Sequence, residues 1–151
     1  MRKFLKGFVY AWRGLITCVK EERNFRFHLV VAFHLFVYLP FFVLTRAEVC
    51  EIIILCGLVI AAEAMNSATE RAVDATGRHN AAAGAAKDIA AGGVLTLAIT
   101  AAVCGVKLLW QPAAFRAIAA FYIRRPWAAI LQGIAAAGGV EFIKGRRRGS
   151  R

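Results

Sequence analysis

The sequence lacks the short motifs that mark most nucleotide, metal and redox sites. It contains no GxxxxGK[ST] phosphate-binding loop and neither the HRD nor the DFG triplet of protein kinases. Its cysteines show neither CxxC nor metal-ligand spacing, and most lie in apolar surroundings. We therefore interpret them as packing residues and expect neither a disulfide nor a zinc site. They are Cys18, Cys50, Cys56 and Cys104.

Acidic residues are scarce relative to basic ones. The chain carries 9 Asp and Glu against 20 Lys and Arg, which gives a net charge of +11. In a soluble protein this excess would suggest nucleic acid, but here Lys and Arg gather at the ends of apolar segments, without a base-reading motif. We expect these residues to set topology and to contact anionic lipid, and we expect no nucleic-acid partner.

The composition is too apolar for an ordinary soluble domain of this length. Of the 151 residues, 60% are hydrophobic, and the mean hydropathy is +0.58. No secretory signal is evident, since the first long apolar run has no small-x-small cleavage site. We predict an all-α membrane protein built as a helical bundle.

Apolar and charged residues are arranged along the chain as in a small membrane bundle. Residues 2–20 place apolar and basic side chains on opposite sides of a helical wheel, which predicts an amphipathic helix at the membrane interface. Spans are expected where an apolar run approaches the roughly 20 residues that cross a hydrocarbon core. These runs lie at about 27–45, 49–70 and 89–110.

Beyond the membrane domain, residues 1–110, the chain continues into a C-terminal extension, residues 111–151. A weaker apolar run at 127–143 is a candidate fourth span, and a basic tail follows at Arg146–Arg148. With the N-terminus in the cytoplasm, the positive-inside rule favours a fourth crossing, because that crossing returns the tail to the cytoplasmic side. The arginines between 116 and 125 would then lie outside, so the sequence leaves the crossing open.

A column of polar residues follows the end of the second expected span. Glu63, Asn66, Glu70 and Asp74 share one narrow sector of a helix at about 100° per residue. An unpaired charge at the centre of a span costs roughly 2.5–3.5 kcal/mol, so a functional site is the default interpretation. The alternative is a polar seam that hydrogen-bonds between helices.

This set of residue types suits phosphoryl transfer. Oxygen ligands at helical spacing fit a hard cation such as Mg²⁺, which usually binds together with substrate phosphates. Lys87 can neutralise phosphate charge, and a partly buried carboxylate can take a proton from a hydroxyl. The residues alone establish no more than a metal or cation site.

The run from Glu63 to Glu70 resembles the E-x-x-N-[ST]-A-x-E signature of the small prokaryotic diacylglycerol kinase and undecaprenol kinase family. The resemblance covers roughly residues 1–110 in order and spacing. Its flanking parts look more like the undecaprenol kinase branch. The segments that continue it are Trp12-Arg13-Gly14, Glu22 to His28, Asp74, and Lys87-Asp88 with the Ala-Ala-Gly-Gly run that follows.

The resemblance implies a homotrimer of three-span protomers in the bacterial inner membrane, with active sites shared between subunits near the cytoplasmic surface. The donor would be MgATP and the acceptor a lipid hydroxyl, on undecaprenol in preference to diacylglycerol. By position, Glu63 is the general base, and Glu22 and Glu70 are the magnesium ligands. The implied nucleotide contacts are Asn66, Glu70, Asp74, Lys87 and Asp88, with Lys3 as a weaker candidate.

Two departures from the family pattern limit this transfer of roles. Family members usually have a histidine seven residues before the Lys-Asp pair, where this chain has Asn80, so we assign no role to the neighbouring His79. The extension beyond about Leu109 has no counterpart in the core family. An ion-binding membrane protein or transporter subunit, and an inactive scaffold descended from the kinases, are the alternative functions.

Several of these residues also have ordinary structural interpretations. Glu22 can form a surface ion pair with Arg23 or Arg26, and such pairs contribute little to stability. His28 and His34 are expected to pack or to hydrogen-bond locally, and we expect no metal role for them. Glu22, Lys87 and Asp88 all lie near one predicted membrane surface, which favours a nucleotide site there over an ion path at the midplane.

Overall fold

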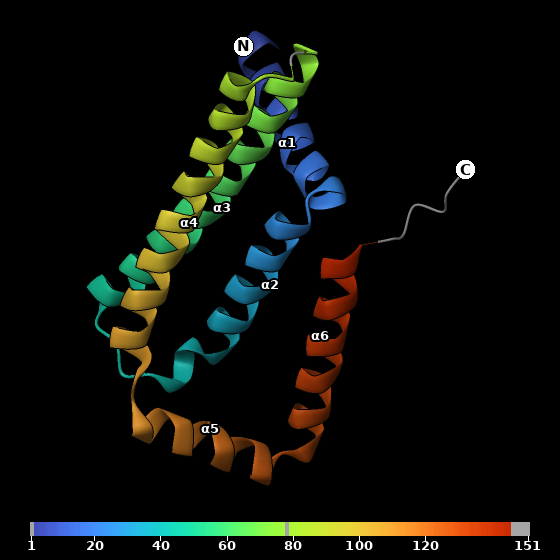
Figure 1. The fold of residues 1–151 in the computed structure, drawn as a ribbon. Helices are drawn as coiled ribbons and strands as arrows, with labels where there is room; N and C mark the ends of the chain where they lie inside the picture. The colour runs from blue at the N-terminus through green and yellow to red at the C-terminus, as the bar shows by residue number, and fades with distance from the viewer. Residues whose placement is uncertain (1, 78, 146–151) are drawn as a thin grey trace.

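The computed structural model describes residues 2–77 and 79–145, with side chains from residue 4 onward. Within these ranges all regular structure is helical (Figure 1), which confirms the predicted all-α fold. The basic tail Arg146–Arg148 and the side chain of Lys3 lie outside the described parts. The elements are α1 (Arg2–Glu21), α2 (Arg23–Tyr38), the 3₁₀ helix η1 (Leu39–Phe41), α3 (Arg46–Ala75), α4 (Ala81–Leu109), α5 (Pro112–Arg124) and α6 (Pro126–Lys144).

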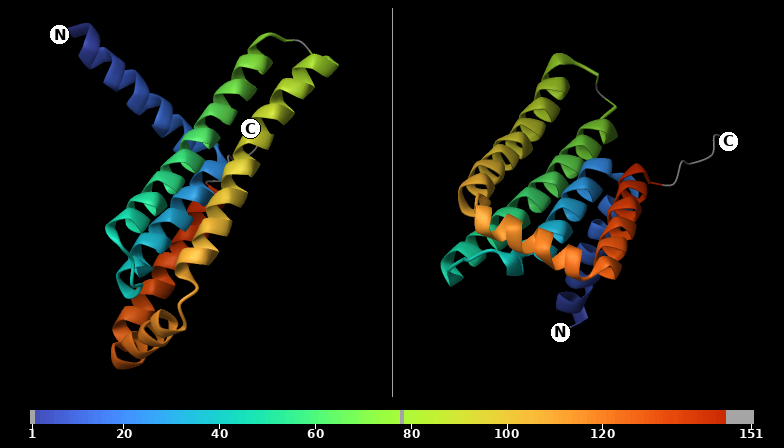
Figure 2. Two further views of the ribbon diagram at one scale, coloured as in Figure 1. Left: turned by 90° about the vertical axis from the view of Figure 1, so that its left-hand side faces the viewer. Right: turned by 90° about the horizontal axis from the view of Figure 1, so that it is seen from below.

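Helices α3 and α4 form a long antiparallel hairpin, and both have side-chain caps at their first turn (Figures 1 and 2). At α3, Glu48 N donates to Thr45 Oγ1 over 3.3 Å and Thr45 N donates to Glu48 Oε2 over 2.7 Å, a reciprocal capping box. These bonds lower the pKa of the Glu48 carboxyl. At α4, Ala83 N donates to Asn80 Oδ1 over 2.9 Å. Asn80 is therefore the N-cap of α4.

Helix α2 ends earlier than the apolar run that encodes it. The sequence placed the first span at about 27–45, whereas the α-helix stops at Tyr38 and the chain tightens into η1 around Pro40 before the capping box of α3. Proline has no N–H to donate, and its ring crowds the carbonyl four residues earlier, so the α-helix cannot continue unchanged. The apolar residues at 42–44 follow the turn and are not helical.

Among the described residues, three segments are long and apolar enough to cross a membrane: Arg23–Phe41, Ala81–Leu109 and Pro126–Lys144. Helix α3 is not one of them, but it runs antiparallel beside α4 (Figure 2). The expected spans at 49–70 and 89–110 fall within α3 and α4, and the candidate span at 127–143 falls within α6. The chain is a multi-pass membrane protein.

Helix α5 crosses the end of the bundle opposite the α3–α4 connector (Figure 1). Gln111, just before α5, donates to Val43 O over 3.2 Å and accepts from Val43 N over 3.0 Å, so it pairs with both polar groups of that residue. Edge-to-face aromatic contacts add to this attachment. They join Tyr38 to Tyr122, Phe41 to Phe121 and Phe42 to Phe115.

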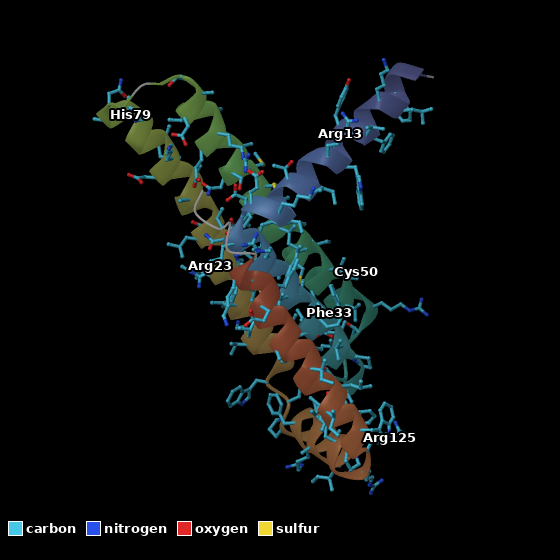
Figure 3. The ribbon with its side chains drawn as sticks, turned by 90° about the vertical axis from the view of Figure 1, so that its right-hand side faces the viewer. Arg13, Arg23, Phe33, Cys50, His79 and Arg125 are labelled. Carbon is cyan, nitrogen blue, oxygen red and sulfur yellow. The ribbon has the colours of Figure 1, made fainter. Side chains whose placement is uncertain are left out.

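Helix α6 returns along α2 toward the junction of α1 and α2. Gly139 permits this approach, because a Cβ atom there would lie only 2.9 Å from Val30 Cγ1. At the end of α6, Ile143 O accepts hydrogen bonds from the Arg26 guanidinium, which also donates to the last carbonyls of α1. Figure 3 shows the two ends of the molecule, with His79 near one end and Arg125 near the other.

Candidate functional site

The polar residues gather at the end of the bundle where α1 stops, α2 begins and the last turns of α3 extend upward (Figure 1). The column on α3 changes its surroundings along its length. Glu63 is 4% exposed, whereas the Asp74 side chain is 60% exposed. A helix that leaves the packed bundle exposes its successive turns to water. The column therefore leads from the interior of the bundle to the solvent.

The buried carboxylate of Glu63 lies against an imidazole on the neighbouring helix. His28 Nε2 is 3.3 Å from Glu63 Oε1. His28 does pack locally, against the ring of Phe27, as expected, and it also contacts Glu63 across the gap between α2 and α3, which the sequence did not indicate. For His34 the expectation is confirmed, since its Nδ1 donates to Val30 O of its own helix over 3.0 Å.

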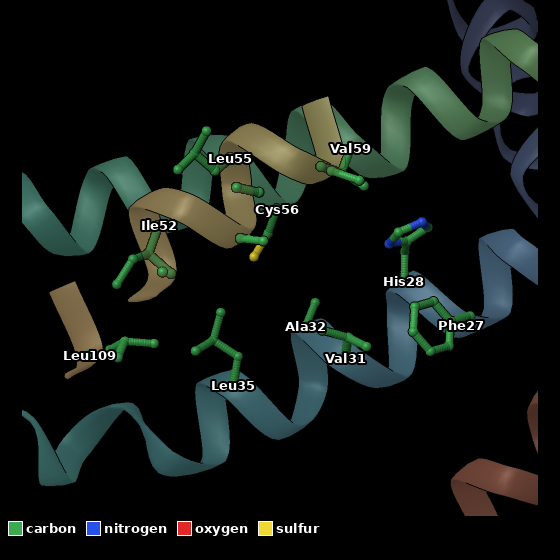
Figure 4. A pocket seen from close by; sticks show the side chains of 14 residues that line it. Phe27, His28, Val31, Ala32, Leu35, Ile52, Leu55, Cys56, Val59 and Leu109 are labelled. Atoms are coloured by element: carbon green, nitrogen blue, oxygen red, sulfur yellow. The ribbon is translucent and has the colours of Figure 1, made fainter. Parts of the chain in front are cut away.

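An apolar cavity of about 320 Å³ begins beside His28 (Figure 4). It lies between α2, α3 and α4, and aliphatic side chains such as Leu35, Ile52 and Val59 line it. On the α4 side its wall consists largely of small residues, which leave room between the helices. These are Ala98, Ala101, Ala102 and Gly105. The polar column and the apolar cavity thus meet at His28 and Glu63.

Glu22 is held by an arginine that the sequence did not indicate. Arg71 Nη2 donates to Glu22 Oε1 over 2.8 Å and to Glu21 Oε2 over 3.1 Å. The hydrogen bond to Glu22 is the main reason that the pKa of Arg71 rises above its ordinary value. The alternative pairing of Glu22 with Arg23 or Arg26 is wrong, because the recorded partner is Arg71.

The middle of the column carries a second polar pair. Asn66 Nδ2 donates to Glu70 Oε1 over 2.9 Å, which fixes the orientation of the amide. Asn66 Oδ1 is then buried and has no partner among the described residues. A buried acceptor without a donor is unfavourable unless a bound group supplies one. This orphaned oxygen fits a site completed by a polar ligand.

The outer end of the column is closed by an ion pair between the two helices of the hairpin. Lys87 Nζ of α4 donates to Asp74 Oδ1 of α3. The structure thus brings together two of the residues predicted to contact nucleotide. It does not bring Asp88 to them by any recorded bond within the described residues, and the Asp88 side chain is exposed. His79 lies exposed in the connector beyond this pair.

The donor set fits a magnesium ion that is shared with phosphate. The negative charges of Glu22 and Glu70 both act on the carboxylate of Glu63. The described residues contain no cluster of three ligand side chains that could hold a metal unaided. Mg²⁺ commonly binds through one or two carboxylates together with substrate phosphates and water. Glu22 and Glu70 stay the predicted ligands.

Sequence reasoning found the column on α3 and named Lys87 of α4, which pairs with Asp74, but it missed the partners of Glu63 and Glu22. His28 was detectable in principle, because it is a polar residue on the same face of α2 as the buried Phe25 and Ala32. Arg71 follows Glu70 directly and carries no signal that distinguishes it from a solvated charge. Arg26 is buried, yet its partners are main-chain carbonyls, which leave no trace in a sequence.

The fold and the site define a multi-pass helical membrane protein with a carboxylate-rich site at one end of its bundle. Residues 9–109 match the sequence model of the prokaryotic diacylglycerol kinase family, up to the last residue of α4. The chain belongs to this family, which places it among the membrane lipid kinases. Helices α5 and α6 lie beyond the matched region.

Two curated relatives support this assignment. The undecaprenol kinase of Bacillus subtilis (strain 168) is 36% identical over 113 residues, which cover 74% of this chain and 91% of the relative. The diacylglycerol kinase of Synechocystis sp. (strain ATCC 27184 / PCC 6803 / Kazusa) is 34% identical over 110 residues, which cover 72% of this chain and 63% of the relative. No solved structure gives a significant match.

Proposed function

We propose that the protein transfers the γ-phosphate of MgATP to the hydroxyl of a membrane lipid, with undecaprenol preferred to diacylglycerol. The observation that carries this proposal is the position of Glu63. Its buried carboxylate lies where an apolar cavity within the bundle meets a polar column that leads to solvent. A lipid can reach this point through the membrane, and a nucleotide can reach it from the water.

In the proposed reaction, Glu63 acts as the general base on the lipid hydroxyl. The hydroxyl oxygen forms a bond to the γ-phosphorus, and the bond from that phosphorus to the β,γ-bridging oxygen breaks, so that ADP leaves. The hydroxyl proton passes to the Glu63 carboxylate. In-line transfer of this kind needs little covalent work from the protein, and catalysis comes mostly from positioning and charge neutralisation.

The remaining residues of the column serve the donor. Asn66 Oδ1 is available to accept from the nucleotide, and Lys87 can leave Asp74 to neutralise a phosphate oxygen. Asp74, Asp88 and Glu70 complete the proposed nucleotide contacts. Mg²⁺, held by Glu22 and Glu70, would supply neutralisation of the phosphate charge. In the free protein, Glu70, Glu22 and Lys87 are paired with other side chains. Each of them can exchange that partner for a group of MgATP.

We also propose that the site faces the cytoplasm of a bacterium, from the inner membrane. The α1–α2 junction, the end of α3 and the end of α6 lie at the same end of the bundle, as their contacts through Arg71 and Arg26 show. A cytoplasmic N-terminus then places the nucleotide site where ATP is present. It also places the C-terminal end of α6, with Lys144, on the cytoplasmic side, as the positive-inside rule favours.

The proposed assembly is a homotrimer. Large apolar side chains are exposed on several spanning helices, including Phe33 and Phe36 of α2 and Leu95 and Ile99 of α4. Lipid or neighbouring protomers can cover such surfaces, and the small residues of α4 allow close approach of another helix. In a trimer whose sites are shared between subunits, side chains of a second protomer would complete the polar column on α3.

The decisive experiment is phosphate transfer from labelled ATP in mixed detergent and lipid micelles containing magnesium. Undecaprenol and diacylglycerol are offered separately to the purified full chain. We expect labelled lipid with both and the higher kcat/KM with undecaprenol. Higher kcat/KM with diacylglycerol would reverse the substrate preference and leave the lipid kinase intact. Folded protein that labels neither lipid would contradict the proposed function.

Arg71 provides a separate test of the magnesium ligands. Because Arg71 competes with Mg²⁺ for Glu22, Arg71→Gln should lower the magnesium concentration that gives half-maximal transfer. The decrease should be roughly two- to fivefold, since exposed ion pairs are weak. A magnesium titration of lipid phosphorylation measures it.

Arg23→Gln is the matched control for this titration. It removes a neighbouring positive charge from the start of α2, and no ion pair is recorded for Arg23 within the described residues. The control should leave the magnesium requirement near that of the parent chain. An equal decrease in both variants would show a general effect of surface charge and would remove Glu22 as the ligand that Arg71 occupies.

A further inference from the structure

His28 occupies the boundary between the two halves of the site. Its ring lines the apolar cavity between α2, α3 and α4 (Figure 4), and the same ring contacts the carboxylate of Glu63. Its side chain is 19% exposed, and that of Glu63 is 6% exposed, so the contact is largely screened from water. His28 ends the segment Glu22 to His28 that continues the family resemblance, but the resemblance gave it no role, and it is not part of the polar column on α3.

We propose that His28 is a positioning residue for the transfer step, which holds one carboxylate oxygen of Glu63 and leaves the other directed at the lipid hydroxyl. The proposal rests on the proposed function, because it names the residue that orients the base at that same site. His28 Nε2 lies 3.3 Å from Glu63 Oε1, an ion-pair contact that a small shift would turn into a hydrogen bond. A neutral imidazole with its proton on Nε2 can donate to this oxygen.

The surroundings of Glu63 explain why the base needs such a partner. Among the described residues, His28 is the one recorded polar partner of the Glu63 side chain, while the charges of Glu22 and Glu70 repel it. A buried carboxylate without a donor would turn toward water or toward a cation. The imidazole keeps it at the mouth of the cavity, where the hydroxyl of a lipid chain would arrive.

The cavity also bears on the identity of the group that meets this pair. Its lining is apolar apart from His28, and its α4 wall is built from small residues. A hydrocarbon chain fits that lining, and the terminal hydroxyl is the polar group that such a chain would bring to Glu63. His28 and Glu63 thus form the polar end of the acceptor site, distinct from the nucleotide side of the column at Asn66 and Asp74.

A purely structural role for His28 is the competing explanation. The ring makes an edge-to-face contact with Phe27, with 5.3 Å between the centroids, and it lies on the same helical face as the buried Phe25 and Ala32. If this packing were all that mattered, an apolar residue of similar size would replace the histidine well. If the contact between the ring N–H and Glu63 matters, a residue that retains a donor will replace the histidine better than an apolar residue does.

The test therefore compares His28→Leu with His28→Gln in the micelle assay with labelled ATP and undecaprenol. Leucine fills the space without a donor, whereas the glutamine amide keeps an N–H at the end of a side chain of similar length. We expect kcat to fall roughly 10- to 100-fold in His28→Leu, as is common when an orienting partner is removed. The KM for ATP should stay within about twofold, and His28→Gln should recover most of the lost kcat.

His34→Leu is the matched control, because His34 lies on the same helix. Among the described residues, its ring bonds only to the carbonyl of Val30, one turn earlier in that helix. It should retain the activity of the parent chain. Helix content and elution in detergent are measured for every variant. If His28→Leu fails to fold, His28→Asn replaces it, since the shorter side chain carries a donor that falls short of Glu63 and should be as slow.

The outcomes separate this proposal from the proposed function. Activity of folded His28→Leu equal to that of His34→Leu would overturn the positioning role, and so would a His28→Gln variant as slow as His28→Leu. If His28→Leu and His28→Gln lost kcat equally and both raised the KM for ATP strongly, His28 would act on nucleotide binding. That result would also overturn the positioning role. A parent chain that phosphorylates no lipid would instead overturn the proposed function itself.

Discussion

Glu63→Gln is expected to fold normally and to lose at least about 100-fold in turnover number with undecaprenol. General-base catalysis typically contributes about 10²–10⁴-fold to a rate, and an amide cannot take the hydroxyl proton. The substitution keeps the shape of the side chain, and the amide can still contact His28. The measurement is kcat at saturating ATP and lipid in magnesium-containing micelles.

The stability of the same variant provides an independent readout. Removing the charge of Glu63 relieves its repulsion by Glu22 and Glu70 and removes the cost of burying a carboxylate. Thermal unfolding in detergent should therefore occur at the same temperature as in the parent chain or at a higher one. Loss of activity together with unchanged or increased stability would separate a chemical role from a structural one.

Glu51→Gln is the control for this experiment. Glu51 lies on α3, twelve residues before Glu63, and its side chain is exposed. The control removes one carboxylate from the same helix without touching the polar column, so its kcat should match that of the parent chain. Turnover of Glu63→Gln close to that of Glu51→Gln would exclude Glu63 as the general base.

The part of the site that followed from residue spacing alone, without the family resemblance, is the part that depends on a single helix. The spacing of Glu63, Asn66 and Glu70 fixes their common face, because one helix repeats every 3.6 residues whatever surrounds it. The Asn66–Glu70 hydrogen bond follows from this periodicity. The ends of helices were predictable where local chemistry decides them, and Pro40 explains why α2 stops short of the expected boundary.

The contacts between helices were not predictable in the same way. Periodicity says which residues of α2 share a face, but it does not say which helix that face meets or at what height. The pairings of His28 with Glu63 and of Arg71 with Glu22 depend on the relative shift of α1, α2 and α3. Composition predicted a candidate span in the extension. It did not predict that this helix, α6, packs against α2 through Gly139.

Replacing Arg26 should have the largest effect on the folded structure. Its guanidinium is buried, at 6% exposed, and donates to Val19 O and Lys20 O over 3.1 Å and to Ile143 O over 3.1 and 3.3 Å. It thus joins the ends of α1 and α6, whose last carbonyls have no partners within their own helices. The planar fork of arginine suits this bridge, and a lysine cannot reproduce it.

Arg26→Leu is therefore expected to lower the free energy of unfolding by about 3 kcal/mol or more, since hydrogen bonds from a charged donor contribute about 1.5–3 kcal/mol each and are not additive. Denaturation in detergent measures the loss. The last turns of α6 should also become more accessible to limited proteolysis, because this end of the helix loses its attachment to the α1–α2 junction. Arg23→Leu, at an exposed position one turn earlier, should change neither quantity.

Gly145 offers a graded version of the same test. Its φ of 69° is a conformation that L residues rarely adopt, and a Cβ atom there would lie 2.8 Å from Arg26 Nη2. Gly145→Ala should therefore weaken the attachment of α6 in the same direction as Arg26→Leu and by less. Because both substitutions act on one contact, their effects should combine to less than the sum. Full additivity would mean that Gly145 and Arg26 stabilise the protein separately, and the attachment of α6 would then need another explanation.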